Sequence, residues 1–354
     1  MIRMRKPIHQ SSAEEGRALL ERAPVVHLAT TGEDGHPILR AVHGVVDGDL
    51  LAFHGAPVGE KTTGIGRRAV IAAHEVVAEI PSWFLDPERA CPATTYYVSA
   101  QVDGVIEEVR DPDAKARILQ TMMRKFQPEG RHAPIRADDP LYAKAVDGLL
   151  VAGIRLENVV CKAKLGQNRR PEERRRVIEQ LWRRGAPGDA RAVHTLVRRF
   201  PELTPSFLLR DGIRLACAID ETELDEIGTL LDDAYWLVGV PRAMVFGAFL
   251  ASQAVVTARD ERTGALVAVA RATSDGKVAW VYDVMVRADL RGSGAGSAVM
   301  ELLLDHPAVR VARHVRLTTR DAMAFYRRIG FLELDEVPRH ASRLVDMVRA
   351  GGPT

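Results

Sequence analysis

The sequence predicts a two-domain protein: a β-rich first domain with flanking helices over residues 1–205, and a second α/β domain with a mixed central sheet over residues 206–354. Three observations support this prediction. The 354 residues exceed the roughly 100–200 typical of one domain. Short strand patterns dominate the first half, whereas strand and helix patterns alternate in the second. Between the halves, Pro201 and Pro205 interrupt the periodicity.

Composition narrows the class of protein further. The formal net charge is only +2, so bulk charge predicts no nucleic-acid partner. No run of about 18 apolar residues occurs, and the basic N-terminus leads into a helical pattern instead of the apolar core of a signal peptide, so no membrane association is expected. Cys91, Cys161 and Cys217 are too far apart to indicate a disulfide framework or a metal site. These features predict a cytoplasmic protein.

The first domain is expected to open with an amphipathic helix over residues 13–23 and to continue as short strands. Glycine and proline between residues 31 and 37 predict a hairpin connection, and Asp47-Gly48 predicts the next turn. Strands are expected within residues 25–30, 38–46, 47–56, 69–77 and 95–109. This near-regular spacing of short strands favours a sandwich or a small barrel over parallel βαβ units.

Two later helices of this domain carry clear end signals. Asp111 is a good N-cap, and Pro112 suits the first position of a helix that runs to Phe126. The second helix begins at Pro171 and ends at Gly185. Acids and bases four residues apart on a solvated face explain its many arginines better than a nucleic-acid contact does.

The second domain is expected to begin with a strand over residues 213–219. Asp220 and Glu223 then form a capping box for a helix over residues 221–236. A helix over 241–254 follows, then strands over 253–260, 265–274 and 277–286, a helix after the glycines, a strand and a last helix. This order predicts an α/β or α+β domain organised around one central strand-to-helix step.

A glycine-rich loop lies at that step. Gly292, Gly294 and Gly296 follow the strand that ends near Val286, and the helical apolar pattern starts directly after them. Amides at a helix N-terminus have no intrahelical acceptor, and glycine has no Cβ to keep an oxyanion away. With the charge of Arg291, the loop therefore suits a pyrophosphate, although a tight turn without a ligand would have the same composition. The spacing matches neither a Walker loop nor a dinucleotide fingerprint.

The residues around this loop resemble a known family. The stretch "DVMVRADLRGSGAG", followed some thirty residues later by "AMAFYRRIGF", is similar to the GNAT superfamily of acetyl-CoA-dependent N-acetyltransferases, whose motif is Q/R-x-x-G-x-G/A. Arg291, Gly294 and Gly296 fill that motif. The resemblance spans roughly residues 212–336 and implies a GNAT acyltransferase fold.

This resemblance implies roles for individual residues. Those expected to hold acetyl-CoA are Val284, Met285 and Val286, which pair with the pantetheine arm, and Arg291, Gly292, Ser293, Gly294, Ala295, Gly296 and Ser297 around the pyrophosphate. Tyr326 matches the family's tyrosine beside the coenzyme sulfur, where a phenol protonates the leaving thiolate. Asp283 is a candidate general base, or equally a carboxylate that anchors a loop. Thr319 stands where many members have asparagine.

The first domain resembles a second family. Residues 25–65, 95–128 and 161–181, in that order, are similar to flavin-nucleotide-binding split-barrel proteins related to pyridoxamine 5'-phosphate oxidase. The resemblance covers roughly residues 13–185 and implies an FMN-binding split β-barrel that dimerises. Lys61 is expected at the FMN phosphate, and His54 near the phosphate or the isoalloxazine edge, while Ser99 and Gln101 are expected to bond the flavin. Members also include haem binders, but Cys91 and His74 match no haem or metal geometry.

Together these features predict an acetyl-CoA-dependent N-acetyltransferase acting on a small amine, fused to an FMN-binding split barrel with a redox or dimerisation role. Retention of Tyr326 with the whole glycine loop favours an active transferase. Two alternatives stay open. One is a flavin-dependent reductase of nitro compounds or quinones, and the other is a ligand-sensing transcriptional regulator whose GNAT domain has lost catalysis.

Overall fold

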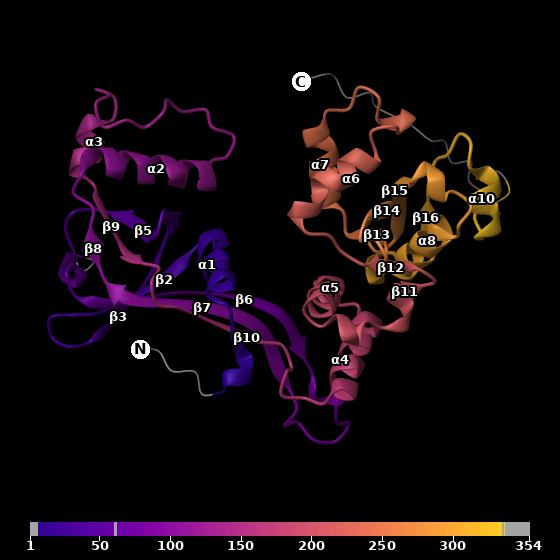
Figure 1. The fold of residues 1–354 in the computed structure, drawn as a ribbon, viewed down its shortest axis with the longest axis horizontal. Coiled ribbons are helices and arrows are strands. Elements are labelled where there is room, and N and C mark those ends of the chain that lie inside the picture. Colours follow the sequence, from indigo (N-terminus) through magenta and orange to yellow (C-terminus); the bar gives the residue numbers. More distant parts are fainter. Residues whose placement is uncertain (1–5, 60–61, 335, 337–354) are drawn as a thin grey trace. The chain divides into compact units, whose positions relative to one another are not determined.

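The computed structural model describes residues 6–59, 62–334 and 336. Contacts between Cα atoms divide the chain into two compact units, Met1–Pro205 and Ser206–Thr354, each with its own sheets and core. Figure 1 shows unit 1 in indigo to magenta and unit 2 in orange to yellow. Within the described residues, no helix is both long enough and apolar enough to cross a membrane.

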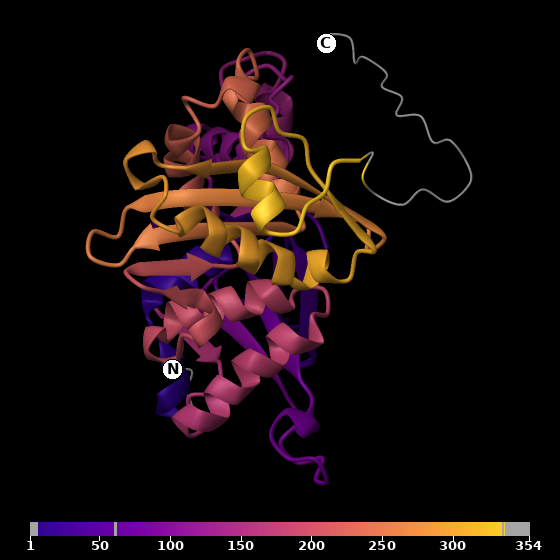
Figure 2. The same cartoon turned by 90° about the vertical axis from the view of Figure 1, so that its right-hand side faces the viewer.

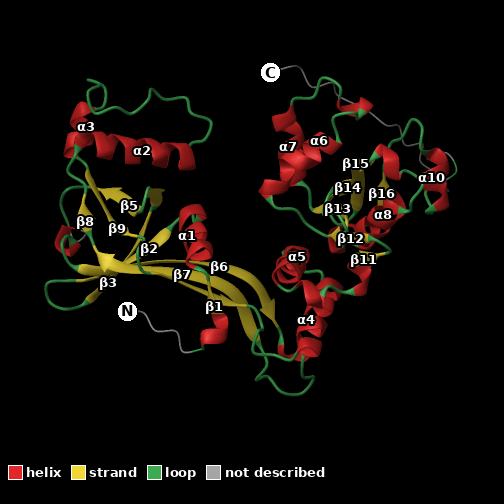
Figure 3. Ribbon diagram, in the orientation of Figure 1, coloured by secondary structure: helices red, strands yellow, loops and turns green. Residues whose placement is uncertain are grey.

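Unit 1 contains two antiparallel sheets (Figure 3). In order across the six-stranded sheet lie β1 Gln10–Ser11, β10 Val159–Lys164, β7 Thr94–Val105, β6 Arg68–Ile80, β2 Val26–Thr31 and β3 Pro37–Val42. Across the four-stranded sheet lie β4 Val45–Asp47, β5 Leu50–Gly55, β9 Leu150–Arg155 and β8 Glu107–Glu108. The β-rich architecture is as predicted, but the described strands pair as two open sheets and do not close into one barrel.

The helices of unit 1 are α1 Ala13–Arg22, α2 Pro112–Phe126, α3 Ala143–Gly148, α4 Pro171–Arg184 and α5 Asp189–Arg199. The predicted caps form: the Asp111 carboxylate accepts the Ala114 amide at 2.9 Å, and Gly185 ends α4 with a φ of +62°. Helix α1 lies directly on β10 and β7. A Cβ at Gly16 would come within 2.7 Å of Val159, so only glycine permits this approach.

Side chains alternate across the six-stranded sheet. On β7, Tyr96, Val98, Ala100 and Val102 are buried in the core, where α1 packs, while Tyr97, Ser99 and Gln101 face the other way and are half-buried. Cross-strand register then sets their neighbours: His74 and Lys162 flank Ser99, and Ala72 and Val160 flank Gln101. The outward face is consequently polar and built partly from small residues.

Unit 2 is a mixed sheet between helices. The strands that the structure describes here are, in order, β11 Leu209–Arg210, β12 Ile213–Ala216, β13 Ala254–Asp260, β14 Leu266–Ser274, β15 Val278–Val286 and β16 His314–Arg316. Among these described strands, β15 and β16 alone pair in parallel. The helices are α6 Leu224–Leu230, α7 Arg242–Ala251, α8 Ala295–Asp305, α9 Pro307–Arg310 and α10 Met323–Arg328. This architecture confirms the predicted α/β domain with a mixed central sheet.

Two layers of helices enclose the unit 2 sheet (Figure 1). Helices α6 and α7 cover a core that includes Phe249, Val269 and Met285. Helix α8 packs on β13 and β14, as Figure 2 shows from the side. The predicted helix over 221–236 is shorter than expected: it stops after Leu230, and a 3-10 turn over Tyr235–Leu237 follows.

Candidate functional site

The central feature of unit 2 is a gap between β15 and β16. The two strands pair only over Val278–Trp280 and His314–Arg316, so β15 continues for six residues without a partner on that side. A cavity of about 460 Å³ opens there. Its walls come from the strand, from the 3-10 turn and from the segment before and within α10: Tyr235, Trp236, Val281, Tyr282, Asp283, Val284, Leu317, Thr318, Thr319, Arg320, Asp321, Ala322 and Tyr326.

A bulge redirects β15 beside this cavity. Tyr282 pairs with Arg271, but Met285 pairs with Val269, so two residues of β15 oppose only Ala270. Asp283 has a φ of +53°, a left-handed conformation that residues other than glycine rarely adopt. The strand resumes its regular pairing from Met285 onward.

The bulge leaves backbone amides available on the open side. The Arg287 amide donates to the Val267 carbonyl, toward β14, at 2.8 Å. Because amides alternate in direction along a regular strand, that of Val286 points toward the open edge. The Met285 side chain, next to it, is buried in the core. The predicted strand segment is therefore placed so that an extended ligand can pair with it.

The glycine loop forms the N-terminus of α8. The first helical bond runs from the Ala298 amide to the Gly294 carbonyl at 3.0 Å, so the amides of Gly296 and Ser297 precede it and have no acceptor within the helix. Gly292 and Gly294 have φ values of +84° and +95°, and a Cβ at either would meet open space. These positions therefore require glycine because of their backbone conformation. The open space beside them has room for an anion.

The neighbouring residues of the loop have different surroundings. Arg291 and Ser293 are exposed, whereas Ala295 is buried at the start of α8. The Ser293 hydroxyl donates to the Leu290 carbonyl at 2.7 Å, which stabilises the turn. Gly296 lies close to the two other parts of the site, since a Cβ there would be 3.2 Å from Val286 and 3.7 Å from Phe325.

Tyr326 reaches the same cavity from α10. Its ring packs edge-on against Phe325 and Phe331, with centroids 5.1 and 5.8 Å away. Burial, together with Tyr235 and Asp321, raises the pKa of the Tyr326 phenol to about 12. The hydroxyl therefore keeps its proton throughout the neutral range and is available as a donor.

Asp283 lies on the cavity wall, but its carboxylate is already engaged. One oxygen accepts the Arg271 Nε at 2.5 Å and the other accepts the Trp236 Nε1 at 2.9 Å. Sequence reasoning missed both partners, because neither belongs to the glycine motif. Thr319, at the position where asparagine was expected, uses its hydroxyl to accept the Ala322 amide at 3.1 Å ahead of α10.

In unit 1 the structure brings together some of the predicted flavin residues. Ser99 and Gln101 lie two apart on the outward face of β7. Lys162 lies beside Ser99 and donates to the Tyr97 hydroxyl at 2.7 Å. Hydroxyl, amide and ammonium groups on a half-buried face suit the polar edge of a flavin. Lys162 was not singled out from the sequence, where only the strand register would reveal its position.

The other two flavin residues are not joined to this face. His54 is half-buried on β5, in the four-stranded sheet, opposite Val151 of β9. Lys61 lies outside the described residues. The phosphate end of the predicted site thus stays a prediction from the sequence.

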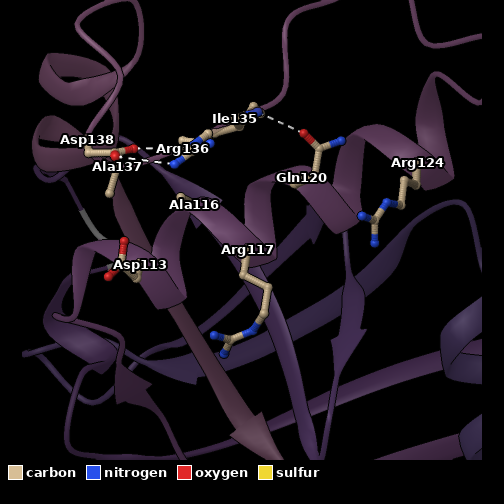
Figure 4. A pocket seen from close by; sticks show the side chains of 9 residues that line it. All are labelled: Asp113, Ala116, Arg117, Gln120, Arg124, Ile135, Arg136, Ala137 and Asp138. Carbon is tan, nitrogen blue, oxygen red and sulfur yellow. Dashed lines mark hydrogen bonds and ion pairs between the residues drawn. The ribbon is translucent and has the colours of Figure 1, made fainter.

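A second cavity, of about 500 Å³, lies along α2 and the segment 135–138. Figure 4 shows Arg117, Gln120 and Arg124 along α2, with the Ile135 amide bonded to the Gln120 side chain. Arg117 is paired with Asp47 at 3.0 Å. Of the predicted flavin residues that the structure describes, His54, Ser99 and Gln101, none lines this cavity.

Comparisons with known proteins agree with this division. The family model described as pyridoxamine 5'-phosphate oxidase matches residues 12–162, and the model described as acetyltransferase (GNAT) family matches residues 225–331. The chain therefore belongs to the GNAT acetyltransferase family through unit 2, joined to a pyridoxamine 5'-phosphate oxidase-like domain in unit 1. The resemblance predicted from the motifs is confirmed.

The chain is similar to two curated acetyltransferases. It is 31% identical over 139 residues to GCN5-related N-acetyltransferase 1, chloroplastic, of Arabidopsis thaliana, covering 36% of this chain and 68% of that protein. It is 31% identical over 119 residues to the uncharacterized N-acetyltransferase ycf52 of Porphyra purpurea, covering 31% and 65%. Among solved structures, the flavocytochrome Anf3 of Azotobacter vinelandii is 18% identical over 46% of this chain and 73% of that one, with a TM-score of 0.40.

Proposed function

We propose that the chain transfers the acetyl group of acetyl-CoA to a primary amine of a small molecule. The observation that carries this proposal is the shared cavity: the open edge of β15 and the Tyr326 side chain line the same space of about 460 Å³. The open edge of β15 from Val284 to Val286 suits the pantetheine arm, and the N-terminus of α8 suits the pyrophosphate.

The reaction follows from this placement. The neutral amine attacks the thioester carbonyl, and a C–N bond forms as the carbonyl oxygen becomes an oxyanion. An amide on the open edge of β15 stabilises that oxyanion. When the intermediate collapses, the C–S bond breaks and the Tyr326 phenol gives its proton to the departing thiolate. The amine proton leaves to water, after which Tyr326 regains its own.

For unit 1 we assign an FMN-binding role to the outward face of the six-stranded sheet. Ser99 and Gln101 would bond the flavin edge, and Lys61 and His54 would hold the phosphate. When bound, the flavin would supply hydride or electron transfer, which makes a second, redox activity on nitro or quinone substrates the alternative function. The same face would pair two copies of the chain, which we expect to be a cytoplasmic homodimer.

Two measurements on one sample test the proposal. The absorption spectrum of the purified protein reports a bound flavin, and calorimetric titration with acetyl-CoA reports the transferase site. Saturable binding of acetyl-CoA, followed by release of free thiol with members of an amine panel, is expected. Saturable binding without turnover on any amine would favour the sensing role, and no binding at all would refute the acetyltransferase proposal.

A further inference from the structure

A buried ion pair holds a carboxylate on the wall of the unit 2 cavity. The Asp283 side chain is 5% exposed and that of Arg271 is 13% exposed, with Nε and the carboxylate oxygen 2.5 Å apart. The second oxygen of Asp283 accepts the Trp236 indole at 2.9 Å. Both oxygens therefore already accept a hydrogen bond from within the protein.

Arg271 is itself held from several sides. Its Nη1 donates to the Ser252 hydroxyl, just after α7, at 3.2 Å. The guanidinium carbon stacks 4.7 Å from the centre of the Tyr282 ring and 5.6 Å from that of Phe249. A planar guanidinium satisfies these contacts together, which an ammonium on a flexible chain cannot do. Arg271 therefore presents Asp283 with a donor of fixed position.

This arrangement matters because of where Asp283 sits. Its left-handed backbone, at a φ of +53°, is strained for a residue with a side chain and persists only when its surroundings hold it. Val284, which also lines the cavity, follows directly. Trp236 belongs to the 3-10 turn, which also lines the cavity. One carboxylate thus joins the β15 part of the cavity wall to the turn that carries Trp236.

We propose that Arg271 is a positioning residue for acetyl transfer: it holds Asp283 and, through it, sets the open edge of β15 and the Trp236 wall at a fixed separation. The inference rests on the proposed acetyltransferase function and assigns Asp283 to positioning instead of proton abstraction. Arg271 touches neither the thioester nor the amine and acts only through Asp283.

Three variants test this assignment by activity. R271Q leaves a buried carboxylate without its cation, and we expect kcat to fall about 20-fold while the affinity for acetyl-CoA changes less than about twofold. In R271Q/D283N the buried charge is gone and an amide can still accept the Trp236 indole, so kcat should recover to within about fivefold of the parent. If D283N and the double variant are both less active than R271Q, Asp283 is the base and the proposal fails.

R259Q is the matched control. Arg259 pairs with Glu223 at 2.9 Å and Glu226 at 2.7 Å in the same unit, but none of the three lines the cavity. It should lower stability and leave kcat unchanged. If R271Q behaves in the same way, its ion pair is only structural and the positioning role is refuted.

Hydrogen exchange gives a readout that needs no turnover. R271Q should speed exchange at the amides of Met285, which pairs with Val269 of β14, and Leu237, which donates to the Ala234 carbonyl at 2.9 Å, whereas R259Q should speed it at neither. Exchange that stays as slow as in the parent would refute the coupling. If these amides respond but the parent acetylates no amine, the proposed function has failed while the structural coupling stands.

Discussion

The two six-stranded sheets of this protein differ in how they leave room for a ligand. In unit 2, β15 and β16 stop pairing after three residues each, and a cavity opens along the freed backbone. In unit 1, β7 stays paired with β6 and β10 through Ser99 and Gln101. There, only side chains on the sheet face are available. Backbone groups thus build the first site, and side chains must build the second.

This difference predicts how each site responds to substitution. A backbone site is insensitive to most side-chain changes but fails when the backbone conformation is altered. A side-chain site loses affinity by one hydrogen bond at a time. The following variants separate the two cases, from the largest expected effect to the smallest.

The largest effect is expected for Gly294→Val. A β-branched residue is strained at a φ of +95°, so the N-terminus of α8 would reorganise and lose several amide contacts to the pyrophosphate. The affinity for acetyl-CoA, measured by calorimetry, should fall roughly a thousandfold. Gly276→Val is the control, because Gly276 has a φ of +81° and equally open space but lies in the turn before β15. Equal affinity of the two variants for acetyl-CoA would show that the glycine loop is not part of the acetyl-CoA site.

The next effect concerns acid stability of unit 2. His306 is 3% exposed, and burial lowers the pKa of its imidazole to about 4. Since the unfolded chain binds a proton near pH 6.5, stability is complete above that pH and is lost as the pH falls toward about 4.

Between about pH 7.5 and 4.5 the loss should be about 2.5 kcal/mol, measured by urea unfolding. His306 caps α9 by accepting the Ala308 amide at 3.2 Å, and His306→Asn keeps a capping side chain. This variant should flatten the pH dependence. An unchanged slope would show that another group is responsible.

An intermediate effect is expected for Tyr326→Phe. The ring packing against Phe325 and Phe331 is preserved, but the proton donor is removed, so kcat should fall about 30-fold with little change in acetyl-CoA affinity. Because the pKa of Tyr326 is raised to about 12, the parent rate should show no titration of this group below about pH 11. Tyr235→Phe, in the same cavity, is the control and should keep its rate. Equal kcat in the parent and in Tyr326→Phe would show that Tyr326 is not the general acid.

The smallest effect belongs to the side-chain site. Ser99→Ala should weaken FMN binding about fivefold, because one hydrogen bond is lost and its neighbours stay in place. Flavin fluorescence measures this binding. Thr31→Val, an exposed hydroxyl at the end of β2 in the same sheet, should have no effect. An equal loss of FMN binding in both variants would show that the flavin does not bind on the outward face of β7.

Local signals explain which elements were predictable. Caps and turn residues at Asp111, Pro171 and Gly185 defined α2 and α4, because the energy of a helix end depends on a few adjacent residues. Strands β9 and β10 were missed. The apolar run of β9 carries no alternation that separates a buried strand from a buried helix, and β10 alternates over only four residues, Cys161–Lys164. Their pairing with β5 and β7 is distant in sequence.

By itself, the sequence determined the two-family identity and the glycine loop, since both depend on residue type and spacing over a short stretch. Tertiary structure alone decided what the polar side chains near the loop do. Asp283 is twelve residues from Arg271 and 47 from Trp236, and only the folding of the sheet brings them together. Long-range packing, which no local pattern encodes, therefore places the candidate base Asp283 in buried hydrogen bonds with Arg271 and Trp236.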